Sequence, residues 1–213
     1  MKTILFDFDG TLADTLPLCY YAFQCVFKEY DNKELTSEEI KVMFGPSETE
    51  IIRQNLTNGE QEQAIELYYS KYLEKHSQLV KQNQKIYDLL RFLRDKEFKL
   101  GIVTGKAQRS LDISLERLKM KEFFDVIITG DDVHKPKPDP EGIIKALNLL
   151  DIQCEDAVVV GDSDADIAAG LQANIYTVGV QWMTSQQNLE FTVEPHRILK
   201  NISDFSDFIK QKV

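Results

Sequence analysis

Two carboxylates, Asp7 and Asp9, end the first apolar run of this sequence. The run at 4–6 is rich in β-forming residues and Gly10 stops it, which predicts a buried strand followed by a turn. Side chains two residues apart on a strand project to the same side, about 7 Å apart along the backbone. Two carboxylates held there are costly unless a cation or hydrogen bonds compensate them. The spacing therefore indicates a cation site, although acidic residues also mark ordinary turns.

Polar residues also follow the later apolar runs of the chain. They are Thr104, Gly105 and Lys106 at the end of 98–104, Lys135 and Lys137 beyond 125–129, and Asp162, Asp164 and Asp166 at the end of 157–162. The carboxyl ends of parallel strands share one edge of a sheet, where ligands bind. Carboxylate oxygens bind Mg²⁺, and lysines and backbone amides bind phosphate. The sequence therefore predicts a site for Mg²⁺ and a phosphoryl group at this edge.

Apolar periodicity from residue 83 onward predicts alternating strands and helices, as in a parallel α/β sheet with helices on both faces. The expected elements are strands at 98–104, 125–129, 157–162 and 175–180, and helices at 86–97, 107–118, 140–149 and 166–173. The first strand must belong to the same sheet. The sequence between the first strand and residue 83 predicts only helices and loops, which indicates a helical region inserted after that strand.

The inserted region, 14–82, contains four helical patterns. The first lies at 17–30, and the second begins after Ser37 as its N-cap. The third runs through 51–53 after a capping box of Ser47 and Glu50. The fourth lies at 61–79, with Leu73 on its apolar face. The breaks at 44–47 and 57–59 separate these helices. The second break precedes the longest amphipathic pattern of the region.

The composition limits the classes of partner. A formal net charge of −10 argues against nucleic acid or an anionic membrane surface as the main partner. No apolar run approaches the roughly 20 residues that span a bilayer, and the N-terminus does not have the pattern of a signal peptide. Cys19, Cys25 and Cys154 have no metal-ligand spacing and are expected to be reduced thiols. We therefore expect a cytoplasmic protein whose main partner is neither nucleic acid nor a membrane. We also expect it to be a monomer or a weak homodimer.

Four motifs in this order resemble those of the haloacid dehalogenase superfamily. They are DFDGTLADT at 7–15, the strand ending in Thr104, a K-P-x-P lysine, and GDSDAD at 161–166. Residues 83–182 in particular resemble the branch that contains phosphoglycolate phosphatases, pyrophosphatases and β-phosphoglucomutases. The resemblance implies a Rossmann-like core made of 1–13 and 83–213, and an all-helical cap domain at 14–82.

The resemblance also implies a mechanism. Asp7 would attack phosphorus and form an aspartyl-phosphate, and Asp9 would protonate the leaving oxygen and later activate water. Mg²⁺ would be bound by Asp7, the Asp9 backbone carbonyl and Asp162, with Asp166 contributing partly through water.

Further residues would bind the transferred group. Thr104 and the Gly105 amide would hold phosphoryl oxygens, and the K-P-x-P lysine would offset developing charge. Both Lys135 and Lys137 fit that motif, and Lys137 is favoured because it directly precedes the residues that begin a helix. Asp164 is better explained as an acid at a helix N-terminus.

Substrate selection is expected to depend on the cap. The candidates are Gly45, which opens a break before a helix, with Arg53 and Lys41, although an ordinary interhelical turn with surface cations explains them as well. Lys106 and Arg109, at the start of a helix, are expected to be solvated, although either could touch substrate.

Three functions fit these residues. The first is a Mg²⁺-dependent phosphatase that acts through an aspartyl-phosphate on a small phosphorylated metabolite, with phosphoglycolate as first candidate and pyrophosphate as a variant. The second is a β-phosphoglucomutase-type phosphomutase. The third is a non-catalytic phosphate-binding protein, which would be expected to have a broken motif. Asp9 argues against a dehalogenase, since those relatives lack a leaving-group acid there.

Overall fold

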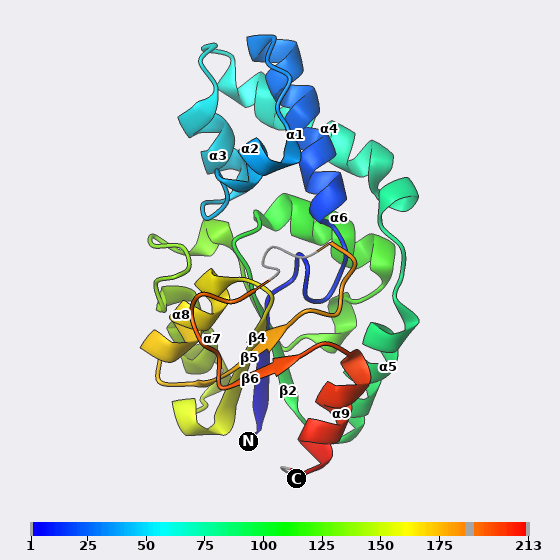
Figure 1. Ribbon diagram of the computed structural model, residues 1–213, viewed down its shortest axis with the longest axis vertical. Helices are drawn as coiled ribbons and strands as arrows, with labels where there is room; N and C mark the ends of the chain where they lie inside the picture. The colour runs from blue at the N-terminus through cyan, green and yellow to red at the C-terminus, as the bar shows by residue number, and fades with distance from the viewer. Residues whose placement is uncertain (1, 186–189, 212–213) are drawn as a thin grey trace.

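A parallel β-sheet forms the centre of the molecule in the computed structural model, which describes residues 2–185 and 190–211 (Figure 1). Its strand order in the described residues is β3-β2-β1-β4-β5-β6, with every neighbouring pair parallel. The first strand lies between β2 and β4, so the residues that follow it reach the middle of the sheet edge. The strands are β1 (Thr3–Phe6), β2 (Lys99–Val103), β3 (Val126–Ile128), β4 (Ala157–Gly161), β5 (Tyr176–Val180) and β6 (Arg197–Leu199).

Helices cover both faces of this sheet, which confirms the predicted fold class. Every residue of β1 is buried, as expected for a strand of a parallel sheet covered on both sides. Ile4 and Phe6 pack in the core with α5, α6 and α9, and Leu5 packs on the opposite face with α7 and α8. These helices are α5 (Gln84–Asp95), α6 (Gln108–Leu118), α7 (Glu141–Leu150), α8 (Asp164–Gln172) and α9 (Ile202–Lys210).

Four further helices follow β1 and lie beyond the carboxyl ends of the strands (Figure 1). They are α1 (Leu16–Asp31), α2 (Ser37–Lys41), α3 (Glu48–Asn55) and α4 (Gln61–Leu79), and we call them the helical region. Helix α1 packs along α4, and the ring centroids of Phe23 in α1 and Tyr68 in α4 lie 4.7 Å apart. Residues 14–82, all of them described, contain no strand, as predicted. The division into a cap domain at 14–82 and a core at 1–13 and 83–213 stays a prediction.

Several local predictions were wrong. Thr36 rather than Ser37 is the N-cap of α2, because its hydroxyl accepts the Glu39 N–H and the Glu39 carboxylate accepts the Thr36 N–H. Ser47 is the N-cap of α3, but its side chain makes no capping hydrogen bond. Leu73 is 45% exposed, because α4 buries a narrower stripe than the sequence pattern suggested.

Two elements near the C-terminus were not predicted. The strand β6 has three residues at the edge of the sheet, too few for a readable alternation. The helix α9 buries Ile202, Phe205, Phe208 and Ile209, whose helical spacing was the signal that was missed. No helix in the described residues combines the length and the apolar character needed to cross a membrane.

A buried histidine joins the helical region to the sheet-covering helices. His76 of α4 is 1% exposed, and its Nε2 lies 3.1 Å from the Ser114 hydroxyl of α6. The Tyr72 hydroxyl lies 2.8 Å from the same Ser114 oxygen. Burial, together with the positive charges of Lys106 and Arg117, lowers the pKa of His76 to about 4.

We expect this histidine to make stability depend on pH. Between its usual pKa of 6.5 and about 4, His76 takes up a proton in the unfolded chain but not in the folded one. Stability is therefore lost as pH falls through that window, by up to about 3 kcal/mol from this residue. Denaturant unfolding of wild type and His76→Gln from pH 4 to pH 7 is expected to show a smaller slope in the variant. The matched control, His134→Gln at an exposed position, should keep the wild-type slope.

Candidate active site

The residues that follow β1, β2 and β4 meet at one cavity of about 280 Å³. The Asp7 N–H donates to the Val160 carbonyl at 2.9 Å, and the Thr104 N–H donates to the Ile128 carbonyl at 3.0 Å, so the sheet ladder fixes both residues. The helical region lines the opposite side. The residues around the cavity are Asp7, Asp9, Leu16, Cys19, Phe23, Lys41, Phe44, Gly45, Pro46, Glu48, Ile51, Thr104, Gly105, Lys106, Lys137, Ser163, Asp164 and Ala165.

Three buried carboxylates form the acidic part of the site. Oxygens of Asp7, Asp162 and Asp166 all lie within 4.8 Å of one another. The Thr11 hydroxyl donates to Asp162 Oδ1 at 3.2 Å. Gly10, with φ of +85°, leaves room for this carboxylate, since a Cβ there would lie 2.3 Å from Asp162 Oδ2.

A partly buried lysine joins two of these carboxylates. Lys137 Nζ donates to Asp7 Oδ1 at 2.7 Å, to the Val103 carbonyl at 3.1 Å, and to Asp166 Oδ1. The other oxygen of Asp166 accepts the Ser163 N–H at 3.1 Å and the Ser163 hydroxyl at 2.6 Å, in the capping box that begins α8. Lys135 is exposed, and its backbone N–H bonds to Glu141. Of the two K-P-x-P lysines, the structure thus places Lys137 in the site.

The electrostatics of this cluster follow from its burial. Burial raises the pKa of Asp7 to about 7, against the opposing effect of the Lys137 ammonium. Burial also disfavours the charged form of Lys137, but the carboxylates of Asp166 and Asp7 outweigh it and raise its pKa. The acidic groups outnumber the lysine, so the cluster favours an added cation.

The donor set of Asp7, Asp162 and Asp166 fits Mg²⁺, which prefers hard carboxylate oxygens. The Asp9 carboxylate does not belong to this group of three. Its oxygens accept from the Thr15 hydroxyl and, at 3.2 Å, from Lys106 Nζ. The metal contact expected of the Asp9 backbone carbonyl stays a prediction.

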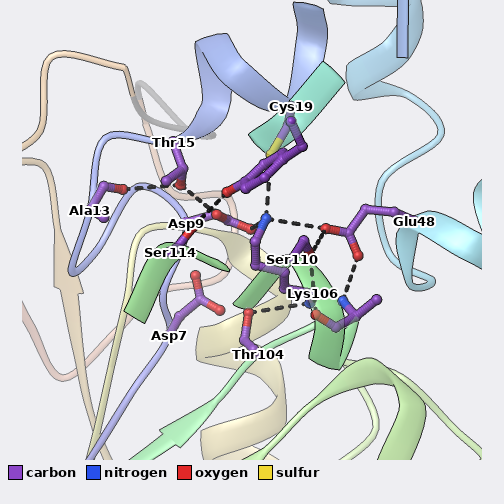
Figure 2. A network of polar contacts seen from close by, with 12 residues as sticks. Asp7, Asp9, Ala13, Thr15, Cys19, Glu48, Thr104, Lys106, Ser110 and Ser114 are labelled. Carbon is purple, nitrogen blue, oxygen red and sulfur yellow. Dashed lines mark hydrogen bonds and ion pairs between the residues drawn. The ribbon is translucent and has the colours of Figure 1, made fainter. Parts of the chain in front are cut away.

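Lys106 is buried rather than solvated, so that expectation was wrong. Its side chain has 0% exposure, and its ammonium lies between Asp9 and the Glu48 carboxylate, as Figure 2 shows. The Lys106 N–H also donates to the Thr104 hydroxyl at 3.3 Å. No sequence pattern indicated this burial, because the partner Glu48 resembles an ordinary first-turn acid of a helix.

The two glycines expected to bind substrate lie together at the cavity. Gly45 adopts φ of +141°, and a Cβ on Gly105 would lie 3.2 Å from the Gly45 carbonyl oxygen. A side chain at position 105 would therefore crowd the Gly45 carbonyl. Gly45 and Gly105 therefore bring the two sides of the cavity into close approach.

Of the two cations expected to bind substrate from the cap, only one lines the cavity. Lys41 lines the cavity, whereas Arg53 does not and instead pairs on the surface with Glu62 at 3.1 Å and with Glu50 at 3.6 Å. Arg109 is also on the surface, where it pairs with Glu66. Asp164 accepts the N–H of Thr192 at 2.9 Å while also bordering the cavity.

Sequence reasoning gave no role to Thr15, Glu48 and Cys19, nor to apolar residues of the cavity wall such as Leu16, Phe23 and Phe44. Thr15 and Glu48 contact the network around Asp9, and Cys19 is a buried part of the cavity wall. Burial raises the pKa of Cys19 to about 12, so it stays a neutral thiol. These contacts join the start of α1, the start of α3 and the residues before α6, which are far apart in the sequence. A local sequence pattern therefore does not indicate them.

The site combines a buried aspartate after the central strand with an acidic cluster and a lysine, which are the groups that a phosphoryl-transferring hydrolase needs. Residues 4–180 match the family model described as haloacid dehalogenase-like hydrolase, and the chain belongs to this family.

Individual relatives agree with this assignment. The chain is 33% identical over 204 residues to the pyrophosphatase PpaX of Bacillus mycoides, covering 96% of this chain and 94% of that protein. A solved structure titled as a predicted phosphoglycolate phosphatase from Haemophilus somnus has a TM-score of 0.85 at 20% identity, covering 98% of each chain. The putative β-phosphoglucomutase from Thermotoga maritima has a TM-score of 0.76 at 27% identity, covering 100% of each chain.

Proposed function

We propose that this protein is a Mg²⁺-dependent phosphatase that hydrolyses a small phosphorylated metabolite through an aspartyl-phosphate on Asp7. The observation that carries the proposal is the cavity of about 280 Å³ with Asp7 and Lys137 on one side and Lys41 on the other. It supports a compact substrate whose phosphoryl group meets Asp7 and whose second anionic group meets Lys41. Phosphoglycolate, with one phosphate and one carboxylate, has this form.

Each residue has a distinct role in the proposed reaction. The Asp7 carboxylate attacks phosphorus while the Lys137 ammonium stabilises charge on the transferred group. Asp9 gives its proton to the leaving oxygen, which keeps the electron pair of the broken P–O bond, and later takes a proton from water. Mg²⁺ held by Asp7, Asp162 and Asp166 would offset the repulsion between a carboxylate and a phosphate dianion.

Pyrophosphate is a second candidate substrate. The specific observation in its favour is the 33% identity to a pyrophosphatase over nearly the whole of both chains. The apolar part of the cavity wall, formed by residues such as Leu16, Phe23 and Ile51, instead favours a substrate with a carbon skeleton. A matched comparison of the two compounds decides between them.

The deciding experiment measures phosphate release from phosphoglycolate, pyrophosphate, an aryl phosphate, sugar phosphates and nucleotides, with and without Mg²⁺. One strong Mg²⁺-dependent preference would establish the phosphatase and its substrate. Dependence on a sugar bisphosphate would instead indicate a phosphomutase. If a folded protein that binds Mg²⁺ releases no phosphate from any of these compounds, the non-catalytic alternative would be favoured.

Two matched cation variants test how substrate is recognised. Lys41→Gln is expected to raise the KM for the preferred substrate about 10-fold, because one charge-assisted contact is lost. Arg53→Gln, which neutralises a cation of the same helical region that does not line the cavity, should leave KM within about twofold. Equal KM values in wild type and the Lys41 variant would remove Lys41 from the proposal.

Metal dependence is a further expectation. Chelation with EDTA should abolish turnover, and added Mg²⁺ should restore it. Asp162→Asn is expected to raise the Mg²⁺ concentration for half-maximal activity at least about 10-fold, because one carboxylate ligand is lost. Titration calorimetry with Mg²⁺ alone checks the loss of affinity without relying on turnover. Unchanged Mg²⁺ affinity in this variant would contradict the assigned ligand set.

A further inference from the structure

The ammonium of Lys106 is buried among groups from separate parts of the chain. It lies 3.2 Å from Asp9 Oδ2, 3.1 Å from Glu48 Oε1, 3.6 Å from Cys19 Sγ and 4.5 Å from the centre of the Tyr72 ring. Burial disfavours its charged form, but Asp9 and the other neighbours outweigh this and raise its pKa well above the usual value. Lys106 is therefore a fixed positive charge beside Asp9.

Glu48 connects this lysine to the helical region. It lies in the first turn of α3 with only 7% of its side chain exposed. Its carboxylate accepts from Lys106 Nζ and, at 2.5 Å each, from the Ala107 N–H and the Ser110 hydroxyl. Three donors around the start of α6 thus converge on one carboxylate of α3, as the dashed lines in Figure 2 show.

Asp9 is held on both of its carboxylate oxygens. The Thr15 hydroxyl donates to Oδ1, and Lys106 donates to Oδ2. When Asp9 gives its proton to the leaving oxygen, it becomes a carboxylate, and an ammonium at this distance stabilises that product. Thr15 and Lys106 thereby fix the orientation of the Asp9 carboxyl group, and Lys106 stabilises the carboxylate that remains after the proton has left, without having to touch the substrate.

We infer that Lys106 is a positioning residue for the acid Asp9, and that Glu48 of the helical region positions Lys106 in turn. The inference rests on the proposed function, in which Asp9 protonates the leaving group. It makes proton donation depend on a contact between the helical region and the sheet-covering helix α6. Leaving groups that need protonation should therefore depend on Glu48 and Lys106, and leaving groups that depart as stable anions should not.

A second ion pair between the same regions provides a matched control. Arg109 of α6 donates to Glu66 of α4, with one contact at 2.9 Å, and both side chains are more than half exposed. The pair joins α6 to the helical region, as the Glu48 pair does. Within the part of the chain that the structure describes, the contacts of this pair do not include Asp9. Glu66→Gln therefore removes a similar bridge and leaves the environment of Asp9 intact.

The test compares kcat/KM for phenyl phosphate and 2,4-dinitrophenyl phosphate, measured with Mg²⁺ on the full chain. Phenolate is a poor leaving group and dinitrophenolate a good one, so only phenyl phosphate needs strong proton donation. Lys106→Met is expected to lower the value for phenyl phosphate about 30-fold and that for the dinitrophenyl ester less than about threefold. Glu48→Gln is expected to lower kcat/KM about 10-fold for phenyl phosphate and less than about threefold for the dinitrophenyl ester. The ratio of the two substrates in one sample is independent of the fraction of folded protein.

Three further variants interpret the result. Asp9→Asn should show the largest leaving-group dependence, and a uniform loss there would refute the acid assigned in the proposed function. Selective loss in Asp9→Asn with uniform losses in the Lys106 and Glu48 variants would overturn only the present inference. Glu66→Gln should keep the wild-type ratio, and a changed ratio there would mean that any bridge between the regions has this effect. In the double variant of Lys106→Met and Glu48→Gln, the ratio should equal that of Lys106→Met alone, because Glu48 acts through the lysine.

Discussion

Asp7→Asn is expected to lower kcat/KM about 10⁵-fold, because it removes the nucleophile on which the whole reaction depends. The amide has nearly the shape of the carboxylate, and Lys137 keeps its contacts with Asp166 and the Val103 carbonyl. The loss should therefore come from chemistry and not from unfolding.

Stability measurements sharpen this prediction. Burial raises the pKa of Asp7 to about 7, which means that the folded protein disfavours its charge. Without Mg²⁺ at pH 8, replacing this carboxylate by a neutral amide should leave the unfolding temperature at or above that of wild type. Acid-quenched wild type should retain a covalent phosphoryl group, and Asp7→Asn should retain none. Asp7 would be refuted as the nucleophile if the asparagine variant kept about 1% or more of the wild-type turnover rate.

Lys137→Met is expected to lower kcat/KM about 10³-fold, because it removes a cation aimed at the charge that develops on the transferred group. It also leaves Asp7 and Asp166 buried without their shared ammonium. The free energy of unfolding without Mg²⁺ should therefore fall by about 3 kcal/mol. Added Mg²⁺ should recover part of this stability but little of the activity, since the positive charge that Lys137 supplies to the transferred group would still be missing.

Lys135→Met is the matched control for this lysine. The residue belongs to the same K-P-x-P sequence, two positions earlier, but it is exposed and its backbone N–H bonds to Glu141. Activity within about twofold of wild type and unchanged denaturant unfolding are expected. A large loss in Lys135→Met with a small one in Lys137→Met would reverse the assignment.

The two lysines show where the sequence was sufficient and where it was not. The alternation of strands and helices predicted the parallel sheet, and the sheet brings Asp7, Thr104 and Asp162 to one edge. These are local patterns, so periodicity and strand-end chemistry were enough to anticipate them. The sequence also favoured Lys137 over Lys135, because Lys137 directly precedes the residues that begin a helix. Its contacts with Asp7 and Asp166 depend on the path of a loop rich in proline, which periodicity does not describe.

Only the tertiary structure decided which charged residues of the helical region and of the start of α6 belong to the site. Arg53 and Lys106 both resemble surface cations in the sequence, yet Arg53 pairs on the surface and Lys106 is buried beside Asp9. Glu48 likewise resembles a first-turn acid, but it accepts three donors from the start of α6. The physical reason is that burial of a charge is set by partners distant in the chain, and a local pattern contains no information about them. The sequence by itself thus determined the sheet and the chemistry at its edge, and the packing of the helical region on α6 determined how that chemistry is positioned.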